Sequence, residues 1–376
     1  MRGFITALWL AAGVAAQTSY LSRMADSQIR HGVDVNADYP TATLYKGFEY
    51  AIALTNNQSL IDFYESQMTP LVEDDGTIVG FDYSYYSLDD YRFGMNLLYW
   101  YERTGEEKWR LAADGIWQML QKQPRNNAGG FWHRSPTYPY QMWGDGIFMA
   151  DSFYAKYTQL FDNSNTTAWD DIANQYKLYF TNCLDTSNNL TRHGYDESKQ
   201  AVWADPTTGV SPLAWDRAIG WYYTSLLESI PLLPTNHAGY QMLIEYFQTL
   251  SEGLLNAQDE SGGWWLIMDE EYVGVEGNYI ESSATAMFTS GFFQGISLGL
   301  LDEETYLAPA KKAYEFMVDE FVEEKGDGTL NWEGTVLVGS LGSNATFEYY
   351  VSIATDENDY KGAGPFMWAS YFFETL

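Results

Sequence analysis

The chain of 376 residues carries 20 Lys and Arg against 51 Asp and Glu, which gives a formal net charge of −31 at neutral pH and a pI near 4.2. A surface this acidic repels nucleic acid and anionic lipid, so neither is expected as a partner. Cys183 is the only cysteine, which excludes an intramolecular disulfide and any site built from several thiols.

The first 16 residues have the pattern of a secretory signal peptide. Arg2 supplies a positive charge, Phe4 to Val14 is a short apolar stretch, and Ala15 and Ala16 complete a small-residue cleavage site. The apolar stretch is too short to span a bilayer. We therefore expect cleavage before Gln17, secretion into the extracellular medium and no membrane association.

Four N-glycosylation triplets agree with export, although such triplets also occur by chance. They begin at Asn57, Asn165, Asn189 and Asn344.

An internal repeat follows the predicted signal peptide. Five times a helical pattern ends at a Gly-bearing turn, passes through a short aromatic segment and enters another helix. Glycine is the expected stop signal, because it adopts the left-handed conformation at little cost. The five segments begin at Asp75, Gly129, His193, Gly262 and Asp327.

Pairs of helices joined by short polar turns lie between these segments. Apolar spacing predicts the pairs 41–54 with 58–68, 91–103 with 106–122, 145–161 with 167–184, 216–230 with 237–256, and 283–300 with 304–323. The last helix, 365–374, can pair with the first mature helix, 20–31. The sequence therefore predicts six helical hairpins.

The two helices of a pair differ in their apolar pattern. Helix 106–122 has one apolar stripe, as an outer helix does, whereas helix 145–161 is apolar nearly all round, as an inner helix must be. Six inner helices ringed by six outer ones form an all-α (α/α)6 barrel. We expect one catalytic domain over residues 17–376, with the Gly-aromatic segments gathered at one mouth of the barrel.

Two segments place an aspartate where an inner helix is predicted to begin. Asp89 stands in Tyr86-Ser-Leu-Asp-Asp-Tyr-Arg-Phe-Gly94, and Asp145 follows Met-Trp-Gly and precedes Gly-Ile-Phe. A helix N-terminus stabilises a carboxylate, whereas apolar neighbours favour the neutral acid. A carboxyl group under both influences suits proton transfer near mild pH. The alternative for either aspartate alone is a plain helix cap.

Two histidines and an arginine near the same mouth are further candidates. His193 is either a ligand or a hydrogen-bonded surface histidine, and His133 either packs on a sugar ring or caps a turn. Arg217 is costly to bury unpaired, so it holds either Asp216 or a substrate carboxylate. The four histidines of the chain lack metal-binding spacing, so we expect no metal site. Aromatic residues make up 17% of the chain and favour a sugar ligand.

These segments resemble the unsaturated rhamnogalacturonyl hydrolases of glycoside hydrolase family 105 and, more distantly, the unsaturated glucuronyl hydrolases of family 88. The likeness covers nearly the whole chain after residue 16. It rests on Gly129-Gly-Phe-Trp-His-Arg-Ser-Pro-Thr-Tyr-Pro-Tyr-Gln-Met-Trp-Gly-Asp-Gly-Ile-Phe-Met149, on Leu88-Asp89 followed by Gly94, and on Trp203-Ala-Asp205, Thr208-Gly209 and Trp215-x-Arg217-Ala-x-Gly-Trp221.

The resemblance implies roles for individual residues. Asp145 is the general acid and base, and Asp89 is its partner carboxylate. Where the family carries Leu-Asp-Asn, this chain has Leu88-Asp89-Asp90, so Asp90 is an alternative partner and a candidate substrate contact. The residues that bind the uronate ring or shape its subsite are His193, Arg217, Trp221, Trp143 and His133.

The resemblance also implies the reaction. The substrates are oligosaccharides that lyases release from pectin (rhamnogalacturonan), and they end in a 4,5-unsaturated uronic acid. Asp145 protonates C4, and its carboxylate then deprotonates a water that attacks C5, so that the resulting hemiketal opens and expels the aglycone. No metal or organic cofactor is expected, and we expect a monomer.

Three other functions stay open at this point. An inverting glycosidase would use Asp89 and Asp145 as separate acid and base on saturated oligosaccharides. A sugar epimerase on a related barrel would call for histidine bases. A non-catalytic sugar-binding protein would keep the aromatic segments and have no use for Asp145.

Overall fold

Helices that follow one another in pairs account for most of residues 19–376, which are the residues that the computed structural model describes. The predicted signal peptide lies outside them. The pairs are α2 (Tyr39–Thr55) with α3 (Gln58–Met68), α4 (Phe93–Thr104) with α5 (Glu107–Leu120), α7 (Ser152–Phe161) with α8 (Thr166–Cys183), α9 (Asp216–Ser229) with α10 (Ala238–Asn256), α11 (Ser282–Ser297) with α12 (Glu303–Phe321), and α14 (Tyr360–Thr375) with α1 (Tyr20–His31).

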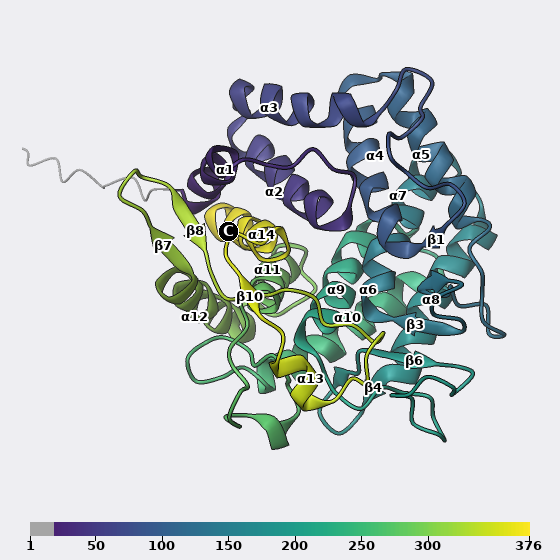
Figure 1. Ribbon diagram of the computed structural model, residues 1–376, viewed down its shortest axis with the longest axis vertical. Coiled ribbons are helices and arrows are strands. Elements are labelled where there is room, and N and C mark those ends of the chain that lie inside the picture. Colours follow the sequence, from purple (N-terminus) through teal and green to yellow (C-terminus); the bar gives the residue numbers. More distant parts are fainter. Residues whose placement is uncertain (1–18) are drawn as a thin grey trace, which may run out of the picture.

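The first helix of each pair belongs to a closed inner ring. Each inner helix contacts the next one in the order α2, α4, α7, α9, α11 and α14, and α14 contacts α2, which closes the ring. Figure 1 shows α3, α5 and α12 outside this ring. The predicted six-hairpin barrel is confirmed. None of the helices in residues 19–376 has both the length and the hydrophobicity of a membrane span.

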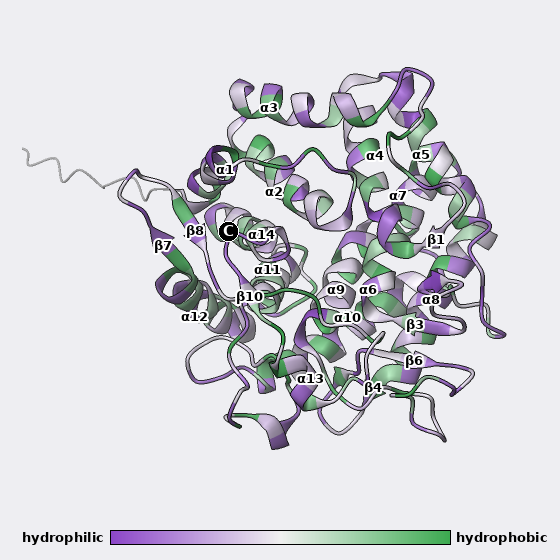
Figure 2. Cartoon of the chain, in the orientation of Figure 1, coloured by the Kyte–Doolittle hydropathy of each residue, from purple (hydrophilic) through white to green (hydrophobic). Residues whose placement is uncertain are grey.

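Burial explains which helix of a pair lies inside. Helix α9 is buried at nearly every position, because it packs on neighbours on all sides. On the outer helix α12, buried residues recur at three- and four-residue spacing, as at Ala310, Ala313, Tyr314 and Met317. Figure 2 shows the corresponding apolar colour on α11 and α14, whereas the turn of the hairpin formed by β7 (Val322–Glu324) and β8 (Leu330–Trp332) is hydrophilic.

Two inner helices begin differently from the prediction. The helix predicted over 145–161 is divided into α6 (Gly144–Gly146), a π-helical turn η3 (Ile147–Asp151) and α7. The helix predicted from Tyr91 begins with a 3-10 turn, η2 (Leu88–Arg92), before α4. Apolar periodicity does not separate these helix types, because their residues per turn are too similar over a single turn.

Five pairs of very short antiparallel strands connect the helices within the described chain. Besides β7 with β8, they are β1 (Tyr86–Ser87) with β2 (Arg134–Ser135), β3 (Gln141–Trp143) with β6 (Gly194–Asp196), β4 (Leu184–Asp185) with β5 (Leu190–Thr191), and β9 (Thr335–Val336) with β10 (Thr355–Asp356). The one-turn helices are η1 (Thr69–Leu71), η4 (Ile230–Leu232), η5 (Glu270–Tyr272) and α13 (Phe347–Val351). The sequence analysis missed these pieces, because two or three residues are too few to show an alternating pattern.

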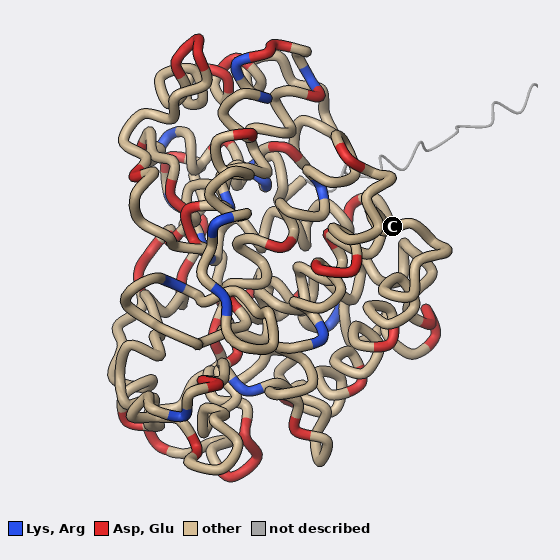
Figure 3. Tube along the Cα trace, turned by 90° about the vertical axis from the view of Figure 1, so that its right-hand side faces the viewer, with Lys and Arg blue, Asp and Glu red and all other residues tan. Residues whose placement is uncertain are grey.

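Charge is distributed unevenly between the surface and the interior. Figure 3 shows acidic residues along the outer turns, with fewer basic residues between them. Inside the barrel, Glu228 accepts two hydrogen bonds from Arg92, at 2.7 and 2.8 Å, and lies 2.7 Å from the Lys46 ammonium group. Burial alone would raise the pKa of Glu228, but the two cations hold it well below its ordinary value. This buried acid is therefore ionised and paired.

Asp151 is a buried acid of the opposite kind. It is fully buried in the π-helical turn, and neither carboxyl oxygen has a hydrogen-bond partner within residues 19–376. Burial, followed by the charge of Asp171, raises its pKa well above the ordinary value. Asp151 is therefore protonated at neutral pH, and folding takes up a proton there.

We predict that Asp151→Asn stabilises the protein at pH 7 and has little effect near pH 4. The free energy of unfolding of the parent protein is highest below the pKa that Asp151 has in the unfolded state. As the pH rises from there toward the raised pKa of Asp151 in the folded state, the free energy of unfolding falls by about 1.4 kcal/mol per pH unit. The amide keeps the neutral form at every pH. Thermal unfolding followed by circular dichroism at both pH values measures the difference, and a variant no more stable than the parent at pH 7 contradicts the assignment.

Candidate active site

Asp145 lies in the first turn of α6, directly after β3. Strand β3 pairs with β6 so that Trp143 faces Gly194, and the Gly144 N–H donates to the His193 carbonyl at 3.0 Å. A Cβ atom at Gly144 would lie 2.6 Å from the Tyr179 hydroxyl, so only glycine fits beside Asp145 at that position. The short sheet therefore fixes Asp145 against His193.

The two oxygens of Asp145 have different surroundings. Oδ2 is buried and lies 3.2 Å from Nε2 of His193, whereas the side chain as a whole is 14% exposed. The exposure must therefore come from Oδ1 and the methylene group. Burial acts to raise the pKa of Asp145, but His193 and then His133 bring it below the ordinary value. The free protein thus holds Asp145 as a carboxylate with one accessible oxygen.

Asp89 is buried in the first turn of η2, between the side chains of Arg134 and His133. Its Oδ2 accepts from Nε of Arg134 at 3.1 Å and also from Nη2, and its Oδ1 lies 3.5 Å from Nε2 of His133. Neither Asp89 nor Asp145 caps its helix: the N-cap positions belong to Ser87 and Trp143, and no capping side-chain bond is present at either end in the described chain. The helix-cap alternative is therefore wrong for both.

His133 lies between the two carboxylates. Its Nε2 faces Asp89, and a Cβ atom at Gly146 would lie 3.0 Å from its Nδ1, so the ring covers the turn that carries Asp145. Burial lowers the pKa of His133, although both aspartates oppose this effect. His133 is therefore a neutral ring that joins the two acids rather than a turn cap.

Asp90 occupies a different environment from Asp89. It is half-buried, and burial followed by the negative charge of Asp89 raises its pKa to about 6. The other charges that act on it are those of Arg134, Asp82 and Asp38, whereas His133 responds to both Asp89 and Asp145. The geometry favours Asp89 as the carboxylate that shares the site with Asp145.

Aromatic rings form one wall of the site. Trp143 stacks on His133 with ring centroids 4.1 Å apart, and Tyr138 lies 4.5 Å from Trp143. The structure brings Trp143 and His133 together, and their role in shaping a sugar subsite stays a prediction. Trp221 lies deeper, 1% exposed and stacked on Phe148 at 4.5 Å.

Tyr39 is a site residue that the sequence analysis missed. It is half-buried at the start of α2, and its ring meets that of Trp221 edge-on at 6.4 Å. Burial raises the pKa of Tyr39, and the charges of Asp89 and Asp145 raise it further. Nothing in the pattern around Tyr39 separates it from an ordinary first-turn residue.

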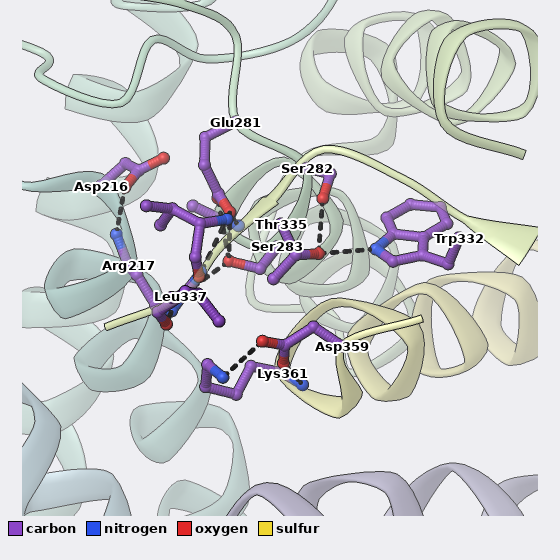
Figure 4. Close-up of polar contacts among 12 residues, drawn as sticks. Asp216, Arg217, Glu281, Ser282, Ser283, Trp332, Thr335, Leu337, Asp359 and Lys361 are labelled. Carbon is purple, nitrogen blue, oxygen red and sulfur yellow. Dashed lines mark hydrogen bonds and ion pairs between the residues drawn. The ribbon is translucent and has the colours of Figure 1, made fainter. Parts of the chain in front are cut away.

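Arg217 is held by partners inside the protein (Figure 4). Its Nη2 donates to Glu281 at 3.1 Å and to the Val336 carbonyl, and its Nε donates to Ser283 at 2.7 Å. The side chain is 1% exposed and Glu281 is fully buried. The sequence suggested Asp216 or a substrate carboxylate as the partner of Arg217. Glu281 was not among the candidates, because it follows Arg217 by 64 residues.

Among residues 19–376, Asp216 accepts only the backbone N–H of Arg217, at 2.7 Å, so the alternative in which the Arg217 side chain holds Asp216 is wrong. Burial and then the charge of Glu281 raise the pKa of Asp216 well above its ordinary value, which leaves it neutral. Contact of Arg217, Trp221 or His193 with a uronate ring stays a prediction. His193 itself is fully buried, with its ring nitrogens facing Asp145 and Tyr350.

A group of carboxylates outside the site lies close enough to share a cation. Glu323, Glu333 and Glu357 have ligand atoms within 4.8 Å of one another. Two of the three are exposed, and Glu323 already pairs with Lys325 at 2.7 Å, so ordinary surface charge accounts for the group.

Comparison with known proteins places this site in a family. The sequence profile of Glycosyl Hydrolase Family 88 matches residues 15–376. The chain belongs to glycosyl hydrolase family 88. This family 88 chain is a hydrolase, as the sequence analysis predicted.

Three relatives illustrate the likeness of this family 88 chain. A family 105 glycoside hydrolase of C. acetobutylicum is 34% identical, with a TM-score of 0.91 over 95% of this chain and 100% of its own. The unsaturated rhamnogalacturonyl hydrolase YesR of Bacillus subtilis is 24% identical over 81% of this chain and 82% of its own. The unsaturated glucuronyl hydrolase of Bacillus sp. GL1, at 12% identity and a TM-score of 0.69 over 95% of each chain, shares the fold. The predicted relationship to families 105 and 88 is confirmed.

Proposed function

We propose that this family 88 hydrolase removes a 4,5-unsaturated uronic acid from the non-reducing end of lyase-generated oligosaccharides, pectin (rhamnogalacturonan) fragments in particular. The observation that carries the proposal is the single carboxylate of Asp145, which has one buried oxygen against His193 and one accessible oxygen at the mouth. The likeness to YesR supports rhamnogalacturonan fragments as the substrate class.

One accessible carboxyl oxygen suffices for both proton transfers of a hydration reaction. The Asp145 proton moves to C4, and the ring oxygen stabilises the positive charge that develops at C5. Water then adds to C5 and gives its proton back to Asp145. The C5 hemiketal opens to a ketone, and C1 becomes a hemiacetal that releases the aglycone as an alcohol.

The reaction is tested with unsaturated disaccharides from a rhamnogalacturonan lyase. Hydration removes the C4=C5 double bond of the terminal uronate. The ultraviolet absorbance of that double bond should therefore disappear while free aglycone accumulates. The matched saturated disaccharide should remain uncleaved. Cleavage of the saturated compound favours the inverting glycosidase, and binding of unsaturated sugars without turnover favours the sugar-binding protein.

Arg134 is the guanidinium placed to receive the substrate carboxylate. Its side chain is 35% exposed at the mouth, in contrast to the buried Arg217, and it is anchored by Asp89. A uronate at the mouth would meet this cation, although the chain as a whole has a formal net charge of −31. Arginine suits carboxylates because its planar donors match both oxygens.

We predict that Arg134→Ala raises KM about tenfold, because a charge-assisted hydrogen bond to the ground state is lost. Arg134→Lys keeps the charge and should show a smaller increase. The methyl ester of the same substrate lacks the carboxylate, so its KM should be the same for parent and Arg134→Ala. A fall in kcat at unchanged KM would instead show that Arg134 acts only through Asp89.

We also propose that residues 1–16 are removed on export and that the mature hydrolase is a monomer in the extracellular medium. Amino-terminal sequencing of the protein secreted from its native host should begin at Gln17. Light scattering coupled to gel filtration should give the mass of one chain plus any glycan. A retained leader or a cell-associated protein contradicts export.

A further inference from the structure

The segment between β9 and β10 crosses the mouth of the barrel, and α13 lies within it. It is anchored at several points: the Leu337 N–H donates to the Ala354 carbonyl at 2.9 Å, and Nε1 of Trp203 donates to the Leu341 carbonyl at 2.6 Å. A second hydrophobic cluster, which includes Trp143, Trp215 and Leu341, binds this segment to the site. The segment is therefore packed against the active site.

Tyr350 of α13 is the residue by which this segment reaches His193. Its hydroxyl lies 2.6 Å from Nδ1 of His193, and its ring stacks on Trp215 with centroids 5.7 Å apart. The side chain is 1% exposed. A Cβ atom at Gly339 would lie 2.8 Å from Trp215 and 3.0 Å from the Tyr350 ring, so the backbone closes tightly over both rings.

His193 is held equally firmly by its own backbone. Its N–H donates to the Leu213 carbonyl at 3.3 Å, and its carbonyl accepts from Gly144 at 3.0 Å. The buried ring faces Tyr350 through Nδ1 and Asp145 through Nε2. The order of protons along Tyr350, His193 and Asp145 therefore decides which oxygen of Asp145 can be protonated.

We propose that Tyr350 is a positioning residue, whose hydroxyl fixes the tautomer of His193 and thereby places the catalytic proton on Oδ1 of Asp145. This proposal rests on the proposed acid and base role of Asp145. Within the described chain, the Tyr350 hydroxyl has no hydrogen-bond partner other than Nδ1 of His193. We assign the phenol as the donor, because its buried proton would otherwise have no acceptor. Nδ1 is then an acceptor, and Nε2 carries the hydrogen. Nε2 lies 3.2 Å from Oδ2 of Asp145, an ion-pair distance, and neither atom makes a hydrogen bond within the described chain.

The consequence concerns the acid form of Asp145. With a protonated Nε2 3.2 Å from Oδ2, a proton on that oxygen would face the Nε2 hydrogen, so a proton on Asp145 belongs on Oδ1, the oxygen that remains accessible to a sugar. In the other tautomer Nε2 is an acceptor, and the proton settles on buried Oδ2 as a donor to His193. That form is protonated but unreactive.

Other titratable groups face the same pair. They are His133 and Arg134 beside β2, Tyr39 from α2, Tyr179 from α8 and Asp89 from η2. Burial raises the pKa of both tyrosines and lowers that of His133, so these three stay neutral through the mildly acidic range. Loss of a proton from Asp145 contributes one limb of the pH profile, in the acidic range, and Asp90, whose pKa is raised to about 6, contributes another.

The test is Tyr350→Phe, which keeps the stacked ring and removes the hydroxyl. We expect kcat to fall by about 10- to 100-fold with KM little changed, since one hydrogen bond to a buried group is lost. The limb that Asp145 contributes to the kcat/KM profile should move to higher pH, because the unreactive form stabilises the protonated acid. Tyr349→Phe is the matched control: its hydroxyl accepts the Ser340 N–H at 3.0 Å in the same segment without touching His193.

A raised KM at unchanged kcat, or equal losses in both variants without a shift of the pH profile, would overturn the proposal. A second measurement does not depend on turnover. Nitrogen-15 NMR of labelled histidines, with His193→Gln to assign the signal, should show His193 of the parent as the Nε2–H tautomer and lose that signature in Tyr350→Phe. An Nδ1–H tautomer in the parent refutes the positioning role. Absence of hydrolysis with an Nε2–H signal refutes the proposed function instead.

Discussion

Replacing Asp145 with Asn is expected to lower kcat by about 10³-fold, because the amide neither donates the proton to C4 nor accepts one from water. The fold should persist, since Asn has the same shape and Oδ2 of Asp145 makes one ion pair, with His193, and no hydrogen bond among the described residues. Loss of double-bond absorbance measures kcat, and circular dichroism checks the fold.

Asp90→Asn is the matched control for Asp145→Asn. Asp90 neighbours Asp89 but lies apart from the pair formed by Asp145 and His193, so its amide variant should keep kcat within a few-fold. Retained turnover in Asp145→Asn would end the acid and base assignment. A similar fall in kcat in both variants would show that the local charge around η2, rather than Asp145 itself, controls the reaction.

Replacing Arg217 with Met is expected to lower the free energy of unfolding by about 3–5 kcal/mol, because the buried carboxyl group of Glu281 then loses its guanidinium partner. The pair lies at 1% and 0% side-chain exposure, so solvent does not compensate for the lost partner. Urea unfolding at pH 7, followed by tryptophan fluorescence, measures the change.

The double variant Arg217→Met with Glu281→Gln supplies the control. Removing both charges should recover much of the lost stability, because the cost comes from the unpaired carboxylate rather than from the missing contact. Substrate binding by Arg217, as the family resemblance implies, would give a raised KM with unchanged unfolding. That outcome contradicts the structural role assigned to the Arg217–Glu281 pair.

The helices could be predicted because each one buries a face whose spacing is visible in the chain. The stripe of Trp109, Ala112 and Ile116 on α5 is fully or almost fully buried, as its three- and four-residue spacing requires. The same spacing placed Asp89 and Asp145 at starts of inner helices. The local spacing of apolar residues was therefore enough to predict the barrel and to select Asp89 and Asp145 as candidate acids.

The partners of the site residues could not be predicted in the same way. Strands β3 and β6 pair over only three residues, yet this pairing brings Asp145 to His193. Glu281 and Tyr350 meet Arg217 and His193 from segments 64 and 157 residues further along the chain. Such contacts depend on how the ring closes, and one sequence contains no local signal for them.

Closure of the ring has a consequence for how the protein is made. The inner ring is completed by contacts between α14 and α2, and Glu374 accepts from the Ser19 hydroxyl at 2.6 Å and from the Leu21 N–H at 3.1 Å. A ribosome must therefore release nearly the last residue before the ring can close. Until then the sides of α2 and α11 that pack on α14 have no cover, which exposes the growing polypeptide to aggregation.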